Sequence, residues 1–260
     1  MRRIALTALI ALAVLAPSCG PAAAERLVVS LSNHRVAVTS SFIGENLVLF
    51  GTVEPDNART PLRPPYDLVV TVTGPRETMR TRRKERVLGV WINTDSREFV
   101  RAPSYLSILS NRPVAEITGQ DALRRLQLGL DNFLLPQRFG SDLGDTARDD
   151  PFRAAFVRLE TQQGLYREAS TAVTFLTPTV FRAAIPLPAN VPTGSYAIDV
   201  KLFARGVQVS SANSALEVIK TGIEQYVADA AHDHGLLYGL ITALMALLIG
   251  WFGSVVFRRD

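Results

Sequence analysis

The strongest constraint on this chain is an uncharged run of 23 residues, 235–257. As a helix rising ~1.5 Å per residue, it exceeds the ~30 Å hydrocarbon core of a bilayer. Tyr238 and Trp251 lie near its two ends, where aromatic side chains anchor helices at the membrane interface. Arg258 and Arg259 follow it, and arginines beside a span favour the cytoplasm. The sequence therefore predicts a transmembrane helix that ends in a short cytoplasmic tail, 258–260.

The N-terminal residues follow the order of a secretory signal. Arg2 and Arg3 precede the apolar run Ile4–Ala16, and Ala22-x-Ala24 supplies small residues for cleavage before Glu25. We therefore predict a signal peptide over 1–24. Together with the cytoplasmic tail, this signal predicts a single-pass protein of the bacterial inner membrane with a periplasmic N-terminal domain.

Cys19, the only cysteine, leaves lipidation as an alternative. Pro17 interrupts the residues before it, and a chain with a transmembrane helix gains little from an acyl group. Cleavage before Glu25 removes Cys19. The exported domain then has no disulfide, thiolate metal site or thiol nucleophile.

The net charge gives no support for nucleic-acid binding. The whole chain carries a formal +4. Removing the signal peptide and the tail 258–260 lowers the formal charge to +1, which is close to neutral. We therefore expect no nucleic acid among the partners.

Short apolar runs with period-2 alternation dominate the exported part, and Pro, Gly, Asn and Asp separate them. Arg205-Gly206 is placed to turn the last two runs into a hairpin. This pattern predicts an immunoglobulin-like antiparallel β-sandwich over 25–222. The strands are expected over 27–31, 35–39, 46–53, 67–73, 86–92, 105–109, 172–176, 180–185, 195–203 and 207–210.

A helical pair is expected as an insertion over about 113–166. Thr118 resembles the start of a capping box, and apolar residues at helical spacing follow it as far as Phe133. Asp150-Pro151 predicts a second helix start, and Gly164 predicts its end. A juxtamembrane helix is expected over 223–234, before the membrane span.

A basic segment joins two of the expected strands. Between Gly74 and Arg86 it holds six basic residues and two acidic ones. A solvated hairpin arm is one interpretation, and docking onto acidic partner loops or anionic headgroups is the other. The basic residues are Arg76, Arg80, Arg82, Arg83, Lys84 and Arg86, which we call the basic arm.

Three other groups of residues receive structural interpretations. Trp91 is expected in the sandwich core, because large aromatic side chains mostly pack. His232 and His234 are too far apart around a helix to chelate one ion, and His34 is expected in a solvated turn. The spacing of four aspartates does not match that of a calcium-binding loop, and it suggests a polar linker instead. They are Asp142, Asp145, Asp149 and Asp150.

No sequence motif of a hydrolase, P-loop enzyme or dinucleotide-binding enzyme is present. We therefore predict no catalytic residue, no cofactor and no metal site, and a protein that is not an enzyme. An envelope hydrolase built on paired carboxylates or on His34 stays open, because such sites need no local motif.

The chain resembles a family of α-proteobacterial transmembrane proteins. The residues that carry the resemblance are Asn46–Thr52, Arg82–Arg86, Trp91–Asn93, Pro192–Tyr196, Leu237–Leu240, Gly250-Trp251 and Phe257–Arg259. The resemblance implies a single-pass protein encoded beside permeases of the sulfite/taurine-exporter type, with no assigned catalytic residues. We therefore expect a non-enzymatic accessory of such a permease. A periplasmic solute-binding or interaction module not tied to a transporter is the alternative.

Overall fold

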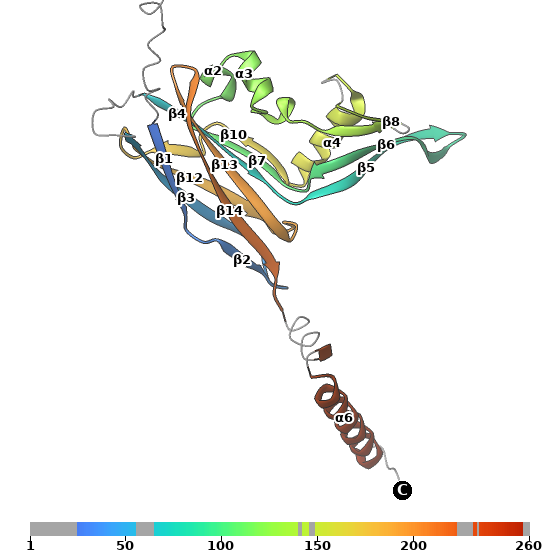
Figure 1. Ribbon diagram of the computed structural model, residues 1–260. Coiled ribbons are helices and arrows are strands. Elements are labelled where there is room, and N and C mark those ends of the chain that lie inside the picture. Colours follow the sequence, from blue (N-terminus) through green and yellow to red (C-terminus); the bar gives the residue numbers. More distant parts are fainter. Residues whose placement is uncertain are drawn as a thin grey trace, which may run out of the picture.

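The computed structural model describes residues 25–55, 65–139, 142–145, 149–222, 231–232 and 234–256. The protein is mainly β, as the sequence predicts, and its strands form three sheets (Figure 1). The predicted signal peptide and cytoplasmic tail lie outside the described residues. So does most of the predicted juxtamembrane helix.

Sheet A has four antiparallel strands in the order β1-β3-β12-β11. Alternation along β12 places Phe181, Ala183 and Ile185 in the core. Gly51 of β3 lies against the Phe181 ring, and a Cβ there would overlap it. The strands are β1 (Glu25–Leu31), β3 (Gly44–Pro55), β12 (Val180–Pro188) and β11 (Val173–Phe175).

Sheet B has six strands in the order β10-β7-β4-β13-β14-β2. The β13–β14 hairpin turns at Arg205-Gly206, as predicted, with positive φ at both residues. Seven of the eight residues of β4 are buried, which fits a central strand covered on both faces. The strands are β10 (Tyr166–Ala169), β7 (Leu106–Ser110), β4 (Tyr66–Thr73), β13 (Gly194–Ala204), β14 (Val207–Lys220) and β2 (Arg35–Val38).

Sheets A and B form two layers around one apolar core (Figure 1). The Tyr105 hydroxyl links them by donating to the Pro186 carbonyl over 2.5 Å. The immunoglobulin-like description fits only loosely, because β10–β7 and β14–β2 are parallel pairs. A third sheet also extends beyond the sandwich.

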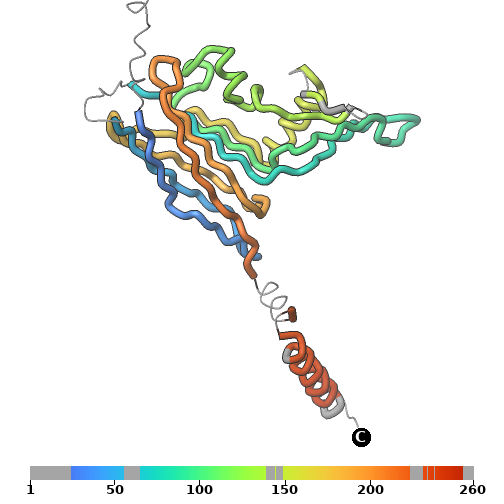
Figure 2. Tube along the Cα trace, in the orientation of Figure 1, coloured from blue at the N-terminus to red at the C-terminus, as the bar shows by residue number. Residues whose placement is uncertain are grey.

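The third sheet is built on a long hairpin of β5 (Arg76–Val87) and β6 (Val90–Pro103), to which β8 (Pro136–Phe139) and β9 (Asp142–Asp145) add. Strand β5 follows β4 of sheet B along the chain, and β6 leads into β7. Backbone hydrogen bonds of 2.8 Å from Gly74 to Tyr105 and from Ser104 to Pro75 hold the junction. Figure 2 shows the hairpin extending away from the two-layer core.

The prediction of a single strand over 86–92 is wrong. Leu88 and Gly89 have φ values of 50° and 88°, so the chain reverses between Val87 and Val90. The basic segment expected to connect two strands is itself strand β5. Alternation alone missed the turn, because Leu88 is an apolar residue in a position that usually takes Asn, Asp or Gly.

The inserted region is less helical than predicted. Thr118 does not cap a helix; its hydroxyl donates to the Gly206 carbonyl over 2.7 Å. The predicted helix through Phe133 breaks early, because Gln127 and Gly129 have positive φ. The region contains α2 (Val114–Ile117), α3 (Gln120–Arg125) and the 3₁₀ turn η1 (Leu130–Asn132).

The second predicted helix is present as α4 (Pro151–Gln162). The Asp150 side chain accepts a hydrogen bond of 2.8 Å from the Arg153 backbone N–H, and Pro151 opens the first turn. Gly164 follows the helix with a φ of 76°, as expected of a helix stop.

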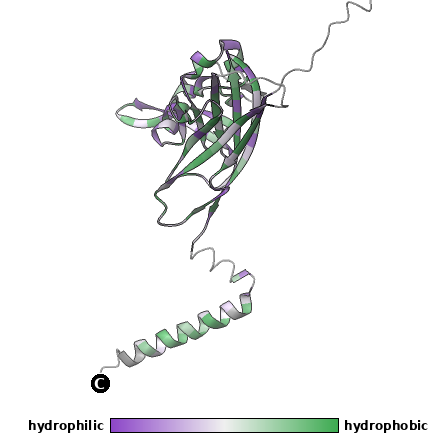
Figure 3. Cartoon of the chain, turned by 90° about the vertical axis from the view of Figure 1, so that its left-hand side faces the viewer, coloured by the Kyte–Doolittle hydropathy of each residue, from purple (hydrophilic) through white to green (hydrophobic). Residues whose placement is uncertain are grey.

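The C-terminal helix is α6 (Gly235–Val256), and most of its coloured residues in Figure 3 are hydrophobic. Among the residues that the structure describes, no helix combines the length and the apolar character needed to cross a membrane. The transmembrane span predicted over 235–257 is therefore not confirmed.

Candidate functional site

The basic arm lies along β5, and all six of its residues are exposed. Its acidic neighbours are already paired: Arg83 contacts Glu85 at 3.0 Å, and Arg80 contacts Glu98 at 3.7 Å. Among the described residues, Arg82, Lys84 and Arg86 form no ion pair. Positive charge is therefore in excess over the outer half of the hairpin.

A groove of about 300 Å³ separates β5 from α4, and we call it the β5–α4 groove. Its apolar part comes from α4, and three of its four cations come from the basic arm. The lining residues are Thr81, Arg82, Arg83, Lys84, Pro151, Phe152, Ala155, Arg158 and Leu159. Arg158 is exposed and, like Arg82 and Lys84, has no ion pair among the described residues. The groove therefore combines an apolar surface with free positive charge.

Aromatic packing fixes α4 against the hairpin. Phe156 stacks on Phe99 of β6 with ring centroids 4.5 Å apart and meets Tyr166 edge-on at 5.7 Å. The Arg97 guanidinium lies 4.9 Å from the Phe152 ring centroid, close enough for a cation–π contact. These contacts hold α4, which forms one wall of the groove, against the hairpin.

The hairpin ends in an apolar tip, residues Val87–Ile92. Leu88 is 100% exposed and Trp91 is 67% exposed. Val87, Val90 and Ile92 are exposed as well. The prediction that Trp91 lies in the sandwich core is wrong, because the turn at Leu88-Gly89 places it opposite Arg86 at the end of the hairpin.

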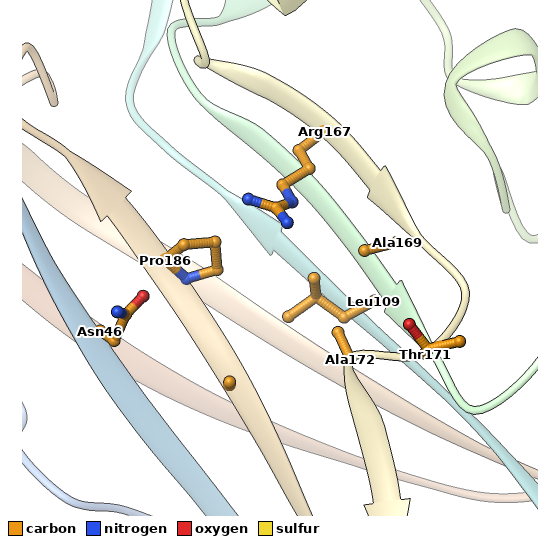
Figure 4. A pocket seen from close by; sticks show the side chains of 8 residues that line it. Asn46, Leu109, Arg167, Ala169, Thr171, Ala172 and Pro186 are labelled. Atoms are coloured by element: carbon orange, nitrogen blue, oxygen red, sulfur yellow. The ribbon is translucent and has the colours of Figure 1, made fainter.

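A second cavity, of about 250 Å³, lies between the edges of sheets A and B. Figure 4 shows Arg167 reaching from β10 over this space, with Asn46, Thr171 and Pro186 around it. Arg167 has no ion pair among the described residues. We call this the Arg167 cavity. The side chains of Arg167, Asn46 and Thr171 carry hydrogen-bond donors of the kind that bind a small anion.

The other predicted residues do not join either site. His34 is exposed in the turn before β2, and its carbonyl accepts from the Glu217 N–H over 2.9 Å. His232 and His234 are exposed, while Asp233 lies outside the described residues. Within the described part of the chain, no three metal-ligating side chains come together. Arg258 and Arg259 lie outside the described residues.

The polar linker predicted from the four aspartates is only partly seen. Asp142 and Asp145 bound the short strand β9, and Asp150 caps α4. Burial raises the pKa of Glu160 on α4, but its carboxyl group lines neither the groove nor the Arg167 cavity. The linings of these two spaces contain no carboxylate.

The sequence patterns singled out part of the residues that line the groove, on two separate segments. They singled out Arg82, Arg83 and Lys84, and they placed Phe152 and Leu159 on one face of a helix. They did not join the two sets, and they missed Arg158. The register shift between Arg83 and Lys84, which decides what each cation faces, has no sequence signature.

Fold and site define a mainly β domain with a cationic groove, followed by an apolar helix. The chain belongs to the family described as "Putative transmembrane protein (Alph_Pro_TM)", whose model matches residues 26–259. No curated protein matches it.

Among solved structures, the chain is similar to the N-terminal domain of the Streptococcus gordonii adhesin Sgo0707. The match has 8% identity and a TM-score of 0.26, and covers 75% of this chain but 32% of the adhesin chain. Similarity at this level carries no argument about fold or function.

Proposed function

We propose that this protein is a non-enzymatic, membrane-anchored docking module of the bacterial inner membrane. Its periplasmic domain would hold an acidic, partly apolar segment of a partner in the β5–α4 groove. The observation that carries this proposal is the apolar lining of the groove beside three cations, Arg82, Lys84 and Arg158, that form no ion pair within the described part of the chain. Such a surface attracts carboxylates and buries the apolar side chains beside them.

The anchor in this proposal is the run 235–257. It has no charged residue, and at ~1.5 Å per residue its length exceeds a bilayer core of ~30 Å. The side chains of Leu237 and of residues 254–257 belong to this run, but they lie outside the part of the chain that the structure describes. The family description, a transmembrane protein, supports the same view.

The partner that we propose is a permease of the sulfite/taurine-exporter type, which the sequence resemblance suggests. The groove volume is at the lower end of the ~300–1,000 Å³ typical of small-molecule sites. A few side chains of a permease loop fit such a groove better than a large cofactor does.

Site-specific photo-crosslinking in cells tests this function. A photoreactive residue replaces Leu159, which is 42% exposed and lines the groove. We expect a crosslink to the co-expressed permease. Because reversed charge repels an acidic segment, Arg158→Glu should lower its yield by about tenfold. Arg182→Glu, at an exposed site on β12, is the matched control and should leave the crosslink yield unchanged. No crosslink, together with reproducible absence of the permease from mild-detergent purifications, overturns the proposal.

A second candidate function is favoured by the Arg167 cavity. A small oxyanion of the sulfite or sulfate type, or the sulfonate of taurine, would accept hydrogen bonds from the Arg167 guanidinium. A ligand that binds only the folded state raises the melting temperature. We therefore expect one of these anions to raise the melting temperature of the wild-type chain but not of Arg167→Gln. A similar rise in both proteins, or none in either, rules this candidate out.

A further inference from the structure

Outside helix α6, the apolar tip holds the densest group of exposed large apolar side chains in the described chain. Singly exposed apolar residues are common on soluble proteins. Here five large apolar side chains, 87, 88 and 90–92, are exposed within six consecutive residues. They lie at the end of a hairpin that projects from the core (Figures 1 and 2). Such a group of exposed large apolar side chains is typical of an interaction surface.

Turn chemistry does not explain the leucine at the centre of the tip. Leu88 has a φ of 50°, a conformation that is costly for most residues with a side chain. Asn, Asp or Gly would form the same two-residue turn more easily. Leu88 is wholly exposed, so packing within the chain does not compensate. Its side chain contributes only if something outside the chain covers it.

The charges around the tip indicate what covers it. From Arg86 to Thr94 the chain contains no acidic residue. The flanking carboxylates are neutralised, since Glu85 contacts Arg83 at 3.0 Å and Asp95 contacts Arg97 at 2.9 Å. Lys84 and Arg86 are left without an ion pair among the described residues. A cationic collar thus follows directly behind the apolar tip.

The spacing of tip and collar matches the outer layer of a bilayer. Lys84 precedes Val87 by three strand residues, or roughly 10 Å at ~3.3 Å per residue. Apolar faces of peripheral proteins enter the headgroup–acyl boundary to a depth of about 5–10 Å. With the tip at that depth, the collar lies at the level of the phosphates. Trp91 is of the type enriched at this interface.

We propose that the apolar tip inserts into the surface of an anionic lipid bilayer, with Lys84 and Arg86 on the lipid phosphates. A bilayer fits this convex tip better than a protein pocket does, because lipid needs no complementary shape. The inference rests on the proposed function in one respect, since the anchor 235–257 would hold the domain close to a membrane. The hairpin would then be a second membrane contact, which fixes how the domain is oriented.

Tryptophan fluorescence of the full chain tests the insertion. The chain has two tryptophans, so Trp251→Phe leaves Trp91 as the only reporter. The protein is reconstituted in nanodiscs of phosphatidylglycerol, with or without brominated acyl chains. We expect a blue-shifted Trp91 emission, quenching by the brominated lipid and protection from acrylamide. In phosphatidylcholine nanodiscs the quenching should be weaker, because the collar then meets no net negative charge.

Matched variants separate insertion from misfolding. Leu88→Asp should lower the inserted fraction by about tenfold or more, because one large apolar side chain leaves the lipid. Its circular dichroism should be unchanged, since the Leu88 side chain is wholly exposed. Ile43→Asp changes another exposed apolar residue, 91% exposed and outside the hairpin, and should leave Trp91 fluorescence unaltered. Lys84→Glu combined with Arg86→Glu should remove the preference for anionic lipid.

Two results would overturn the proposal. In the first, Trp91 in anionic nanodiscs stays open to acrylamide and is not quenched by brominated lipid. In the second, Trp91 becomes protected only when the permease is reconstituted as well, which assigns the tip to a protein partner. The nanodiscs of the first result contain no other protein, so failure of insertion is distinct from failure of the crosslinking experiment at Leu159.

Discussion

At the scale of single residues, Arg153 ties the irregular segment before β8 to α4. Its side chain is buried, and Nη2 donates to the Phe133 carbonyl over 2.6 Å and to the Asp131 carbonyl over 3.3 Å. We expect Arg153→Leu to lower the free energy of unfolding by about 2–4 kcal/mol, because buried carbonyls lose a charged donor. Denaturant unfolding of the full chain in detergent measures this.

Arg158→Leu is the matched control for that prediction. It makes the same substitution on the same helix, but at an exposed position. We expect a change within about 0.5 kcal/mol there. Equal losses at both positions would show that helix composition, and not the buried contacts of Arg153, sets the stability.

The buried tyrosines make a prediction about alkaline pH. Burial raises the pKa of Tyr105 to about 12 and also raises the pKa values of Tyr166 and Tyr196. Below the unfolded-state pKa of ~10, all three are protonated in both states and their contribution is constant. Above it, only the unfolded chain releases their protons. The free energy of unfolding should then fall by about 1.4 kcal/mol per pH unit for each tyrosine.

Unfolding measured at about pH 9 and about pH 11, with phenolate absorbance followed in parallel, tests this sign. Tyr105→Phe should make the pH dependence shallower by one tyrosine. If all three hydroxyls ionise near ~10 while the fold stays intact, the environment assigned to them is wrong.

At the scale of elements, two hairpins share one turn geometry. Leu88-Gly89 has φ values of 50° and 88°, and Arg205-Gly206 has 51° and 84°. Asn tolerates a positive φ better than Leu or Arg. Leu88→Asn should therefore stabilise the β5–β6 turn by about 0.5–1 kcal/mol, seen as slower amide hydrogen exchange between Arg86 and Trp91.

Arg205→Asn should have the same local effect in the β13–β14 hairpin. It should leave Trp91 fluorescence in anionic nanodiscs unchanged, whereas Leu88→Asn should reduce the quenching by brominated lipid. Faster exchange around Asn at either position would contradict the turn geometry.

At the scale of the whole molecule, the proposed topology can be read with single cysteines. Cleavage before Glu25 would remove Cys19 and leave no thiol in the mature chain. In intact cells with a permeabilised outer membrane, an impermeant maleimide should label Ile43→Cys but not Asp260→Cys. Labelling of the unmodified chain would mean that Cys19 is retained, and labelling of position 260 alone would invert the topology.

Local sequence patterns predicted most of the two-layer core. The period-2 runs predicted every strand of sheets A and B except β10, which falls where the end of the helical insertion was expected. Arg205-Gly206 predicted a hairpin, because these signals lie within a few residues of each other. Asp150, Pro151 and Gly164 likewise predicted α4 with its start and its end. The helix start predicted at Thr118 was wrong, because its hydroxyl donates a hydrogen bond to the Gly206 carbonyl. Gly206 lies far along the chain, and no local pattern reveals such a partner.

By itself, the amino-acid sequence determined the β-rich class, the α4 boundaries, the uncharged run 235–257 and the excess of cations between Gly74 and Arg86. Only the tertiary structure decided what those cations surround. Packing of Phe156 on Phe99 brings Arg158 and Arg82 to one groove, and the turn at Leu88-Gly89 exposes Trp91 instead of burying it. Long-range packing and backbone dihedral angles govern these features, and hydrophobic periodicity along the chain encodes neither.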